Sequence, residues 1–252
     1  MDLDLKEMLL AGPEISRTFN SGIRAYLVGG YVRDVLRGIR SKDIDFVVEG
    51  DIRSLVSRLF PERDITVIEF KKAFLVRVVS GDMVLDFSEL KGSIEHDLAR
   101  RDFRMNAMAW SNLEGLIDPF NGLHDIHRRR IRAISEKNFM DDPLRLLRAY
   151  RFAGEMGWTI DAGTRRMIRG LKNLIKLPAS ERITLEVSRL LNSTCYLKAL
   201  RAAFRDGLVG EILSIDNRQL MANIKALSRF HSFLKKLPEE YITGFQKTFS
   251  QE

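Results

Sequence analysis

The pattern of hydrophobic residues changes once along the chain, and this change limits the fold more than any other feature of the sequence. Residues 25–87 hold short apolar and alternating runs, rich in β-branched and aromatic residues, which are typical of strands. From Asp141 onward these signals vanish, and apolar residues recur at the helical spacing. The sequence therefore predicts an α+β chain, with a small mixed sheet first and an all-helical part after it.

The expected elements follow from these patterns and from the turn residues between them. Pro61 ends an amphipathic helix, and Gly81 lies in the turn of a hairpin. The expected strands are 25–30, which ends in a tight turn, 43–48, 65–68, 74–79 and 83–87. The expected helices are 31–36, 51–60, 141–157, 161–176, 181–193, 196–206 and 217–236.

Composition excludes several classes of protein. A hydrophobic content of 45% and a charged content of 30% exclude a disordered chain and a fibrous repeat. The single cysteine, Cys195, can form neither an internal disulfide nor a thiolate metal cluster. No apolar stretch approaches the roughly 18 residues of a transmembrane helix, and residues 1–6 are unlike a signal peptide. We expect a soluble, cytoplasmic protein with no membrane partner.

The net charge of +7 is spread unevenly along the chain. Residues 127–132 read His-Arg-Arg-Arg-Ile-Arg, and the segment 163–176 has basic residues but no acid, among them Arg165, Arg166 and Arg169. Such stripes favour a polyanionic partner, because neutralising phosphates releases counterions. A solvated helix face explains the same charges equally well.

Two carboxylates, Asp43 and Asp45, alternate on an expected strand and therefore point to the same face. Adjacent like charges are costly unless a cation neutralises them, and hard oxygen ligands select Mg²⁺. Asp86 lies in the middle of another apolar strand, where it could supply a third carboxylate. The pattern predicts a metal site for phosphoryl transfer, against the alternative of three solvent-facing acids.

Two further segments suit phosphate and ribose groups. The glycines Gly29 and Gly30, followed by Arg33, lie where a strand passes into a helix, so the backbone could approach a phosphate. In the segment 97–106, arginines suit triphosphate oxygens, whereas an acid and an amide suit ribose hydroxyls. A structural turn and a surface ion-pair network are the alternatives.

A stripe of charge runs along the expected helix 141–157. Its members are Asp142, Arg145, Arg148 and Arg151. Asp142 and Arg145 have the spacing of an ordinary helical salt bridge. An acceptor beside a donor also matches the edge of cytosine and, after rearrangement, of adenine, but it mismatches uracil and guanine.

Five ordered motifs together resemble the class II tRNA nucleotidyltransferase and bacterial poly(A) polymerase family. The motifs are residues 28–34, 43–45, 97–108, 117–122 and 141–152, and residues 181–191 are similar to a later helical motif of that family. The resemblance covers about residues 25–192. It implies template-independent addition of nucleotides to an RNA 3′ end, of which the CCA end of tRNA is the best-known case.

The resemblance also implies roles for individual residues. Asp43 and Asp45 would hold Mg²⁺, with Asp86 in the place of a third catalytic carboxylate, and Asp142 with Arg145 would read the incoming base. With the residues considered above, the expected nucleotide-binding set is Gly29, Gly30, Arg33, Arg101, Asp102, Asn106, Asp142, Arg145, Arg148 and Arg151. The expected RNA-binding residues are Arg165, Arg166 and Arg169.

Three departures from the family pattern stand out. Asp141 replaces the usual glutamate, and the segment between Asp86 and Arg100 is shorter than the loop associated with switching from C to A addition. The chain also ends at Glu252, short of the usual helical body and tail. Addition of only part of the CCA end, and a compact or truncated form, are therefore open alternatives.

These observations together predict a nucleotidyltransferase head over residues 1–134, a helical neck over 135–194 and a short helical body over 195–252. The expected partners are CTP, ATP and the 3′ end of tRNA or another RNA. The alternatives are a poly(A) polymerase and a non-catalytic RNA-binding relative. Clustered Asp43, Asp45 and Asp86 argue against the second, because only a bound cation offsets their repulsion.

Overall fold

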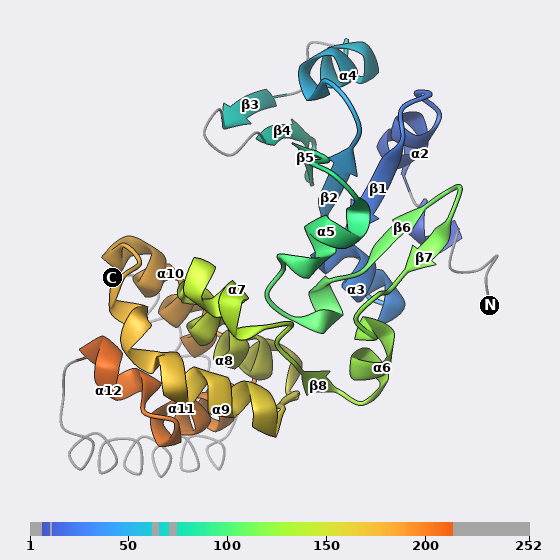
Figure 1. Ribbon diagram of the computed structural model, residues 1–252. Helices are drawn as coiled ribbons and strands as arrows, with labels where there is room; N and C mark the ends of the chain where they lie inside the picture. Colours follow the sequence, from blue (N-terminus) through green and yellow to red (C-terminus); the bar gives the residue numbers. More distant parts are fainter. Residues whose placement is uncertain (1–6, 11, 62–65, 71–74, 214–252) are drawn as a thin grey trace, which may run out of the picture. The chain divides into compact units, whose positions relative to one another are not determined.

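The computed structural model describes residues 7–10, 12–61, 66–70 and 75–213 (Figure 1). The expected helix 217–236, and one end of each of the expected strands 65–68 and 74–79, lie outside the described residues. The chain divides into two compact units. The first unit comprises Met1–Asp141 with Thr159–Thr164, and the second comprises Asp142–Trp158 with Arg165–Glu252.

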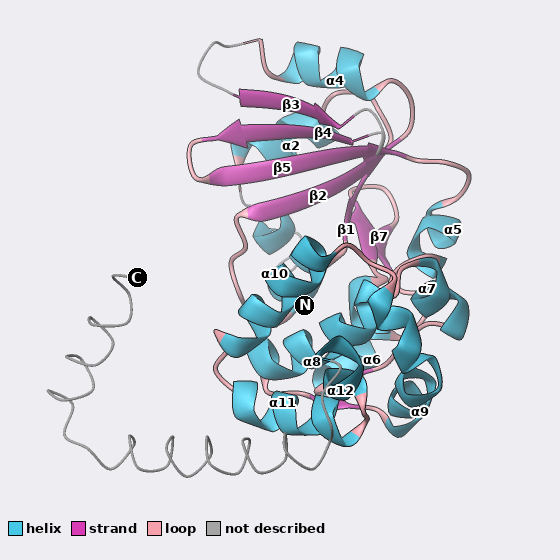
Figure 2. Ribbon diagram, turned by 90° about the vertical axis from the view of Figure 1, so that its left-hand side faces the viewer, coloured by secondary structure: helices cyan, strands magenta, loops and turns pink. Residues whose placement is uncertain are grey.

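A mixed sheet forms the centre of the first unit (Figure 2). The strands are β1 (Ala25–Val28), β2 (Asp43–Val48), β3 (Thr66–Phe70), β4 (Leu75–Ser80), β5 (Met83–Glu89), β6 (Ala109–Ser111) and β7 (Gly115–Ile117). Their order in the sheet is β3-β4-β5-β2-β1-β6-β7. Only the pair β2–β5 is parallel in this seven-stranded sheet of described residues. The predicted fold class, a mixed-sheet head followed by helices, is confirmed.

Strands β6 and β7 were not among the expected elements. Each has only three residues, which is too short for an alternating pattern to be recognised. They nevertheless extend the sheet beyond β1, because Val28 pairs with Ala109 in antiparallel register.

The two faces of the sheet are covered differently. On one face an aromatic cluster packs around the stacked rings of Phe46 and Phe87, whose centroids are 5.0 Å apart, and Phe19 of helix α2 joins it. On the other face Val28 and Val47 pack with residues of helix α5. The helices of this unit are α2 (Pro13–Phe19), α3 (Gly30–Leu36), α4 (Ile52–Leu59), α5 (Ile94–Ala99), α6 (Gly122–His127) and α7 (Glu136–Asp141).

The expectation that strands end before Asp141 is wrong. Strand β9 (Thr159–Ile160) pairs in parallel with β8 (Arg130–Ile131). The hydroxyl of Thr164 also accepts a 2.9 Å hydrogen bond from the backbone N–H of Ala133, which fixes this segment to the first unit. Two-residue strands carry no periodic signal, so the sequence could not show that residues 159–164 belong to the first unit.

Helices dominate the second unit. They are α8 (Leu144–Met156), α9 (Ala162–Leu171, which begins in the first unit), α10 (Ser180–Leu191), α11 (Tyr196–Arg205) and α12 (Leu208–Leu213), with a 3₁₀ segment at Lys172–Lys176. The expected helix 141–157 begins only at Leu144, because Pro143 lacks the N–H that would continue α7. No helix in the described part of the chain is long and apolar enough to cross a lipid bilayer.

A buried carboxylate, Asp206, joins three helices of this unit. It accepts hydrogen bonds from the hydroxyl of Tyr150 at 2.8 Å, from Arg165 at 2.7 and 2.9 Å, and from Arg169 at 3.0 Å. Burial acts to raise the pKa of Asp206, but these hydrogen bonds outweigh it and hold the pKa below its usual range. Two of the arginines expected to bind RNA therefore also stabilise the fold.

We expect Asp206→Ala to lower the free energy of unfolding by about 2–4 kcal/mol, because it leaves buried donors without an acceptor. The matched control is Arg166→Ala on the same helix as Arg165, since Arg166 is exposed and should change stability by less than about 0.5 kcal/mol. Urea unfolding of the variants measures both values. Equal effects would show that the Asp206 network contributes nothing specific.

Candidate active site

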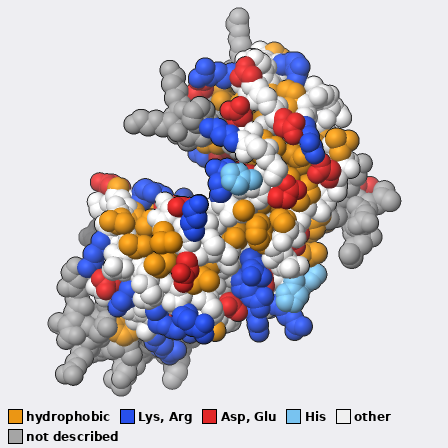
Figure 3. Space-filling model, viewed as in Figure 1, with side chains coloured by type: hydrophobic (Ala, Val, Ile, Leu, Met, Phe, Trp, Pro, Cys, Tyr) orange, Lys and Arg blue, Asp and Glu red, His pale blue; other side chains and the backbone are white. Residues whose placement is uncertain are grey.

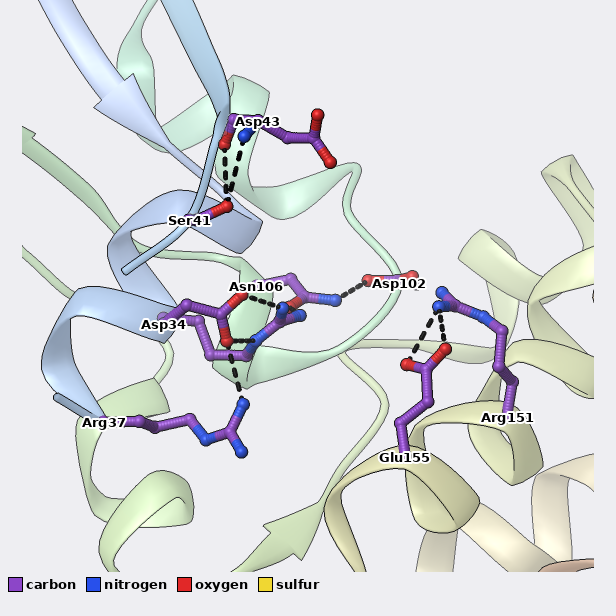
Figure 4. Close-up of polar contacts among 9 residues, drawn as sticks. Asp34, Arg37, Ser41, Asp43, Asp102, Asn106, Arg151 and Glu155 are labelled. Carbon is purple, nitrogen blue, oxygen red and sulfur yellow. Dashed lines mark hydrogen bonds and ion pairs between the residues drawn. The ribbon is translucent and has the colours of Figure 1, made fainter. Parts of the chain in front are cut away.

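The three predicted carboxylates lie on one face of the sheet. Asp43 and Asp45 alternate along β2, and Asp45 stands directly opposite Asp86 in the parallel pair β2–β5. The backbone of Asp43 exchanges hydrogen bonds with the Ser41 hydroxyl at 3.2 and 3.3 Å, which leaves the Asp43 carboxylate outside these bonds (Figure 4). Two carboxylates with the same orientation form an oxygen donor set that fits a hard divalent cation.

The pKa of Asp45 is raised above its usual value. Burial raises its pKa first of all, and the neighbouring charges of Asp86 and Asp43 raise it further. Arg101 and Arg77 act in the opposite direction. The net rise shows that the ionised form of Asp45 is disfavoured in the protein without a bound cation.

Asp86 is already paired, with a residue that the sequence analysis missed. The guanidinium of Arg77 on β4 donates to both carboxylate oxygens of Asp86 at 2.7 Å each. Within the described residues, no three side chains of His, Cys, Asp or Glu are grouped as a metal site. Asp43 and Asp45, the two predicted metal ligands, accept no such bidentate pair of hydrogen bonds from the described residues. A charged residue inside the apolar run of β4 was the signal that could have identified Arg77.

The glycine turn after β1 brings Arg101 close to Asp45. Gly29 has a φ of +71°, and a Cβ there would lie 2.5 Å from Nη1 of Arg101 and 3.3 Å from Oδ2 of Asp45. Only glycine suits such a backbone angle in so little space. The turn thus places a guanidinium next to the carboxylate.

Arg33, Asn106 and Asp102 form a continuous chain of hydrogen bonds (Figure 4). Arg33 donates to Asn106 at 2.7 Å, and the Asn106 amide donates to Asp102 at 2.9 Å. Asp34 holds the other side of Arg33 through bonds of 3.0 and 2.7 Å. Asp102 and Asn106 are buried, so the alternative of a surface ion-pair network does not describe them.

The segment that carries Arg101 is held by two further contacts. Its guanidinium donates to Asp97 at 3.1 and 3.3 Å. The Asn138 amide donates to the backbone carbonyls of Ala99 and Arg101 at 2.8 and 2.6 Å. Asn138 lies between the recognised motifs, and nothing in the sequence singled it out.

In the second unit, Asp142 lies between two arginines. Arg182 approaches its two carboxylate oxygens at 3.3 Å each, whereas the Arg145 contact is longer, at 4.0 Å. The simple salt bridge between Asp142 and Arg145 is therefore not the main contact of this carboxylate. Arg182 was missed, although it lies inside the quoted helical motif at 181–191.

Arg151 is nearly buried and is held by two carboxylates of the second unit. It contacts Glu186 at 2.7 Å and Glu155 at 2.9 Å, and its guanidinium lies 4.1 Å from the ring centroid of Phe152. Figure 4 shows the contact with Glu155. Arg148 also lies over the Phe152 ring, at 5.5 Å. These contacts fix the orientation of both arginines along α8.

The arginines of the segment 127–132 differ in their pairing. Arg132 contacts Asp125 and Asp161 at 3.4 Å each. Arg128, Arg129 and Arg130 are exposed, and among the described residues none of them has a hydrogen-bonded or ion-paired side chain. Figure 3 shows Lys and Arg side chains gathered near a histidine over this α6–β8 region. Arg129 has a φ of +51°, an unfavourable angle for a non-glycine residue.

Comparison with known proteins confirms the predicted resemblance. Residues 25–132 match the family model described as the poly A polymerase head domain. The chain is 41% identical over 199 residues to the CC-adding tRNA nucleotidyltransferase of Synechocystis sp., covering 77% of this chain and 48% of the relative. It is 34% identical over 243 residues to the A-adding tRNA nucleotidyltransferase of Aquifex aeolicus, covering 89% of this chain and 26% of the relative.

The same similarity extends to solved structures. A tRNA nucleotidyltransferase complexed with a primer tRNA and an incoming ATP analogue matches with a TM-score of 0.74 and 33% identity, over 83% of this chain and 66% of that chain. The chain spans 48% of the length of the Synechocystis relative and 26% of the length of the Aquifex relative.

The raised pKa of Asp45 predicts a stability that depends on pH. Because the native state binds this proton more tightly than the unfolded state, ionising Asp45 costs stability at neutral pH. We expect Asp45→Asn to stabilise the protein at pH 7, and the gain to shrink as the pH falls through the folded pKa and to vanish below about 4, where the unfolded state is protonated too. Urea unfolding at several pH values tests this. A variant less stable than the wild type at pH 7 would contradict it.

Proposed function

We propose that this chain, whose head matches the poly A polymerase head domain, is a template-independent nucleotidyltransferase that adds C, A or both to a tRNA 3′ end from CTP and ATP. The observation that carries the proposal is the pair Asp43 and Asp45 on one face of β2, with Arg101 beside Asp45. The relatives named as CC-adding and A-adding enzymes support the same substrate class.

In the proposed reaction the RNA 3′ oxygen forms a bond to the α-phosphorus of the incoming nucleotide. The bond from that phosphorus to the oxygen bridging to the β-phosphate breaks, pyrophosphate leaves, and the 3′-hydroxyl releases its proton to solvent. Asp43 and Asp45 would hold Mg²⁺, which supplies charge neutralisation and activation of the attacking oxygen. The Ser41 hydroxyl hydrogen-bonds the backbone of Asp43, so it does not compete for the Asp43 carboxylate.

The polar residues of the head would bind the triphosphate and ribose. Arg33 is oriented by Asp34 and Asn106, and Arg101 by Asp97, so both guanidinium groups are held before the nucleotide arrives. Preorganised arginines lose less side-chain entropy on binding phosphate than free ones do. The Asp102–Asn106 pair would bind the ribose hydroxyls.

Asp142 and Arg145 would read the incoming base. The contact with Arg182 restrains the Asp142 carboxylate, while the long 4.0 Å contact leaves Arg145 weakly engaged by it. Because Asp142 and Arg145 are not closed into a short salt bridge, a carboxylate acceptor and a guanidinium donor lie side by side, which is the pairing that matches the edge of cytosine.

The RNA backbone would contact two sets of arginines. Arg165, Arg166 and Arg169 remain proposed RNA-binding residues, but Arg165 and Arg169 also bind Asp206. The exposed Arg128 and Arg130 offer guanidinium groups with no internal partner among the described residues. The proposed tRNA substrate agrees with the cytoplasmic location expected from the sequence.

The direct test is nucleotide incorporation with CTP or ATP supplied singly. The RNA substrates are tRNA that ends before the CCA, tRNA that ends in CC, and an unrelated RNA. We expect the wild type to extend at least one of the tRNA substrates, and Asp43→Asn to abolish incorporation while it keeps RNA affinity, because it removes a metal ligand but not an RNA contact.

The pattern of products separates the alternatives. Extension of the unrelated RNA with ATP would indicate a poly(A) polymerase, and extension of only one tRNA substrate would indicate partial CC or A addition. No incorporation by a folded wild type that binds tRNA would contradict the proposal and favour a non-catalytic relative.

A second prediction concerns the RNA backbone. Arg128→Ala with Arg130→Ala should weaken tRNA binding and reduce the slope of log K against log salt by roughly 1.5–2, because two phosphate contacts are lost. The matched control is Arg53→Ala with Arg58→Ala on α4, which removes the same charge. Fluorescence anisotropy over a salt series measures both slopes. Equal slopes in the two double variants would identify 128–130 as a solvated turn.

A further inference from the structure

Asn138, on the short helix α7, is only 5% exposed, and its amide nitrogen points at the end of helix α5. It donates to the carbonyl of Ala99 at 2.8 Å and to the carbonyl of Arg101 at 2.6 Å. The last carbonyls of a helix have no partner within it, and α5 ends at Ala99. Asn138 therefore supplies these donors to the backbone at Arg101 from 37 residues further along the chain.

The orientation of this amide is fixed on its other side. The Ser135 hydroxyl donates to the side-chain oxygen of Asn138 at 2.9 Å and accepts the backbone N–H of Asn138 at 3.3 Å. The amide group thus uses both its nitrogen and its oxygen. Turning it over would place its oxygen against two carbonyls, so one arrangement satisfies all of these groups.

The residues on either side of this asparagine hold the same segment. The backbone N–H of Ile134 donates to the carbonyl of Asp102 at 3.3 Å, and Phe103 forms an isolated antiparallel bridge with Ala133. The rings of Phe103 and Phe139 pack edge to face, with centroids 6.1 Å apart. These contacts fix the backbone just beyond Arg101, and the asparagine amide fixes it at Arg101 itself.

The position of the Arg101 backbone matters because the side chain has little room. Its Nη1 atom lies where a Cβ at Gly29 would be only 2.5 Å away, and its guanidinium donates to Asp97 at 3.1 and 3.3 Å. A shift of the backbone would carry the guanidinium out of this place. Misplacement of a binding group by about 1 Å is enough to weaken a catalysed reaction strongly.

We propose that Asn138 is a positioning residue for the transfer reaction: by holding the backbone of Arg101, it sets where that guanidinium meets the triphosphate of the incoming nucleotide. The inference rests on the proposed function, because it presumes that Arg101 binds the triphosphate. Asn138 itself touches no reacting atom and acts through Arg101.

A merely structural asparagine makes a different prediction. Its loss would lower the free energy of unfolding, since two carbonyls would lose their donors, but a folded variant would bind nucleotide as the wild type does. If Asn138 acts through Arg101, its effect on nucleotide affinity must instead depend on the Arg101 side chain. Its effect on stability need not, because Asn138 bonds the backbone.

The experiment is a double-mutant cycle on the full chain, with Asn138→Ala, Arg101→Ala and both together. Isothermal titration calorimetry measures the dissociation constants of CTP and of ATP, each supplied singly with Mg²⁺ and without RNA. We expect Asn138→Ala to weaken the binding of nucleotide roughly three- to tenfold when Arg101 is present, and by less than about twofold when Arg101 is already replaced. Arg33 stays in every variant and should keep nucleotide binding measurable.

The matched control is Thr18→Ala on α2. Thr18 is fully buried, and its hydroxyl also donates to a backbone carbonyl, that of Glu14, at 2.9 Å. Its loss should lower stability and leave nucleotide affinity unchanged. If Asn138→Ala does not fold, Ser135→Ala replaces it in the cycle, because it frees the amide oxygen but keeps the amide. We expect a weakening of roughly two- to threefold, again only while Arg101 is present.

The outcomes separate this inference from the proposed function. An unchanged nucleotide affinity in the folded Asn138 or Ser135 variant, or an equal loss with and without the Arg101 side chain, would overturn the positioning role and leave the proposed function standing. A wild type that binds neither CTP nor ATP would overturn the proposed function, and the inference with it. A loss of affinity that disappears with Arg101, beside an unaffected Thr18→Ala, supports both.

Discussion

The parallel pairing of β2 with β5 brings like charges together, and the rest of the first unit has to compensate their repulsion. This pairing alone brings Asp45 opposite Asp86, and the alternation along β2 adds Asp43 on the same face. Asp45 and Asp86 are half-buried and Asp43 beside them is exposed, and carboxylates this close together are stable only with cations around them. The charges of Arg101 and Arg77 act to lower the pKa of Asp45, yet burial and its acidic neighbours keep that pKa raised. The site is thus left short of positive charge, which is the condition under which a divalent cation binds well.

The need for positive charge beside these acids also accounts for how Arg101 and Arg33 are positioned. Arg101 can approach Asp45 only because Gly29 has no Cβ, and its backbone is fixed by the amide of Asn138. Arg33 is held in turn by Asp34 and by Asn106. Arg33 and Arg101 are thus each hydrogen-bonded to an acid or an amide outside β2, and these bonds hold their guanidinium groups in place. A preorganised site of this kind stores unfavourable electrostatic energy that ligands relieve.

The sequence predicted those parts of the site that depend on local pattern. Asp43 and Asp45 could be placed on one face because alternation is a property of the strand itself. The partners of these residues depend on strand order and on helix packing, which no local pattern contains. Arg77, Asn138 and Arg182 were missed for this reason. The fold class followed from the change of periodicity, whereas β6, β7 and β9 are too short to produce a periodic signal.

The basic residues show most clearly why charge in a sequence underdetermines function. The segment around Arg165 contains no acid, so the sequence presents it as a free basic stripe, but Asp206 reaches it from a distant helix. Arg128 and Arg130 read as a similar stripe, and in the structure they have no internal partner among the described residues. Arg165 and Arg169 differ from Arg128 and Arg130 in that a buried acid, Asp206, binds the first two. An arginine held by a buried carboxylate gives up part of its hydrogen-bonding capacity, whereas an exposed one keeps all five donors for phosphate. Tertiary pairing, more than the count of arginines, therefore decides which of them keep their hydrogen-bonding capacity for a polyanionic partner.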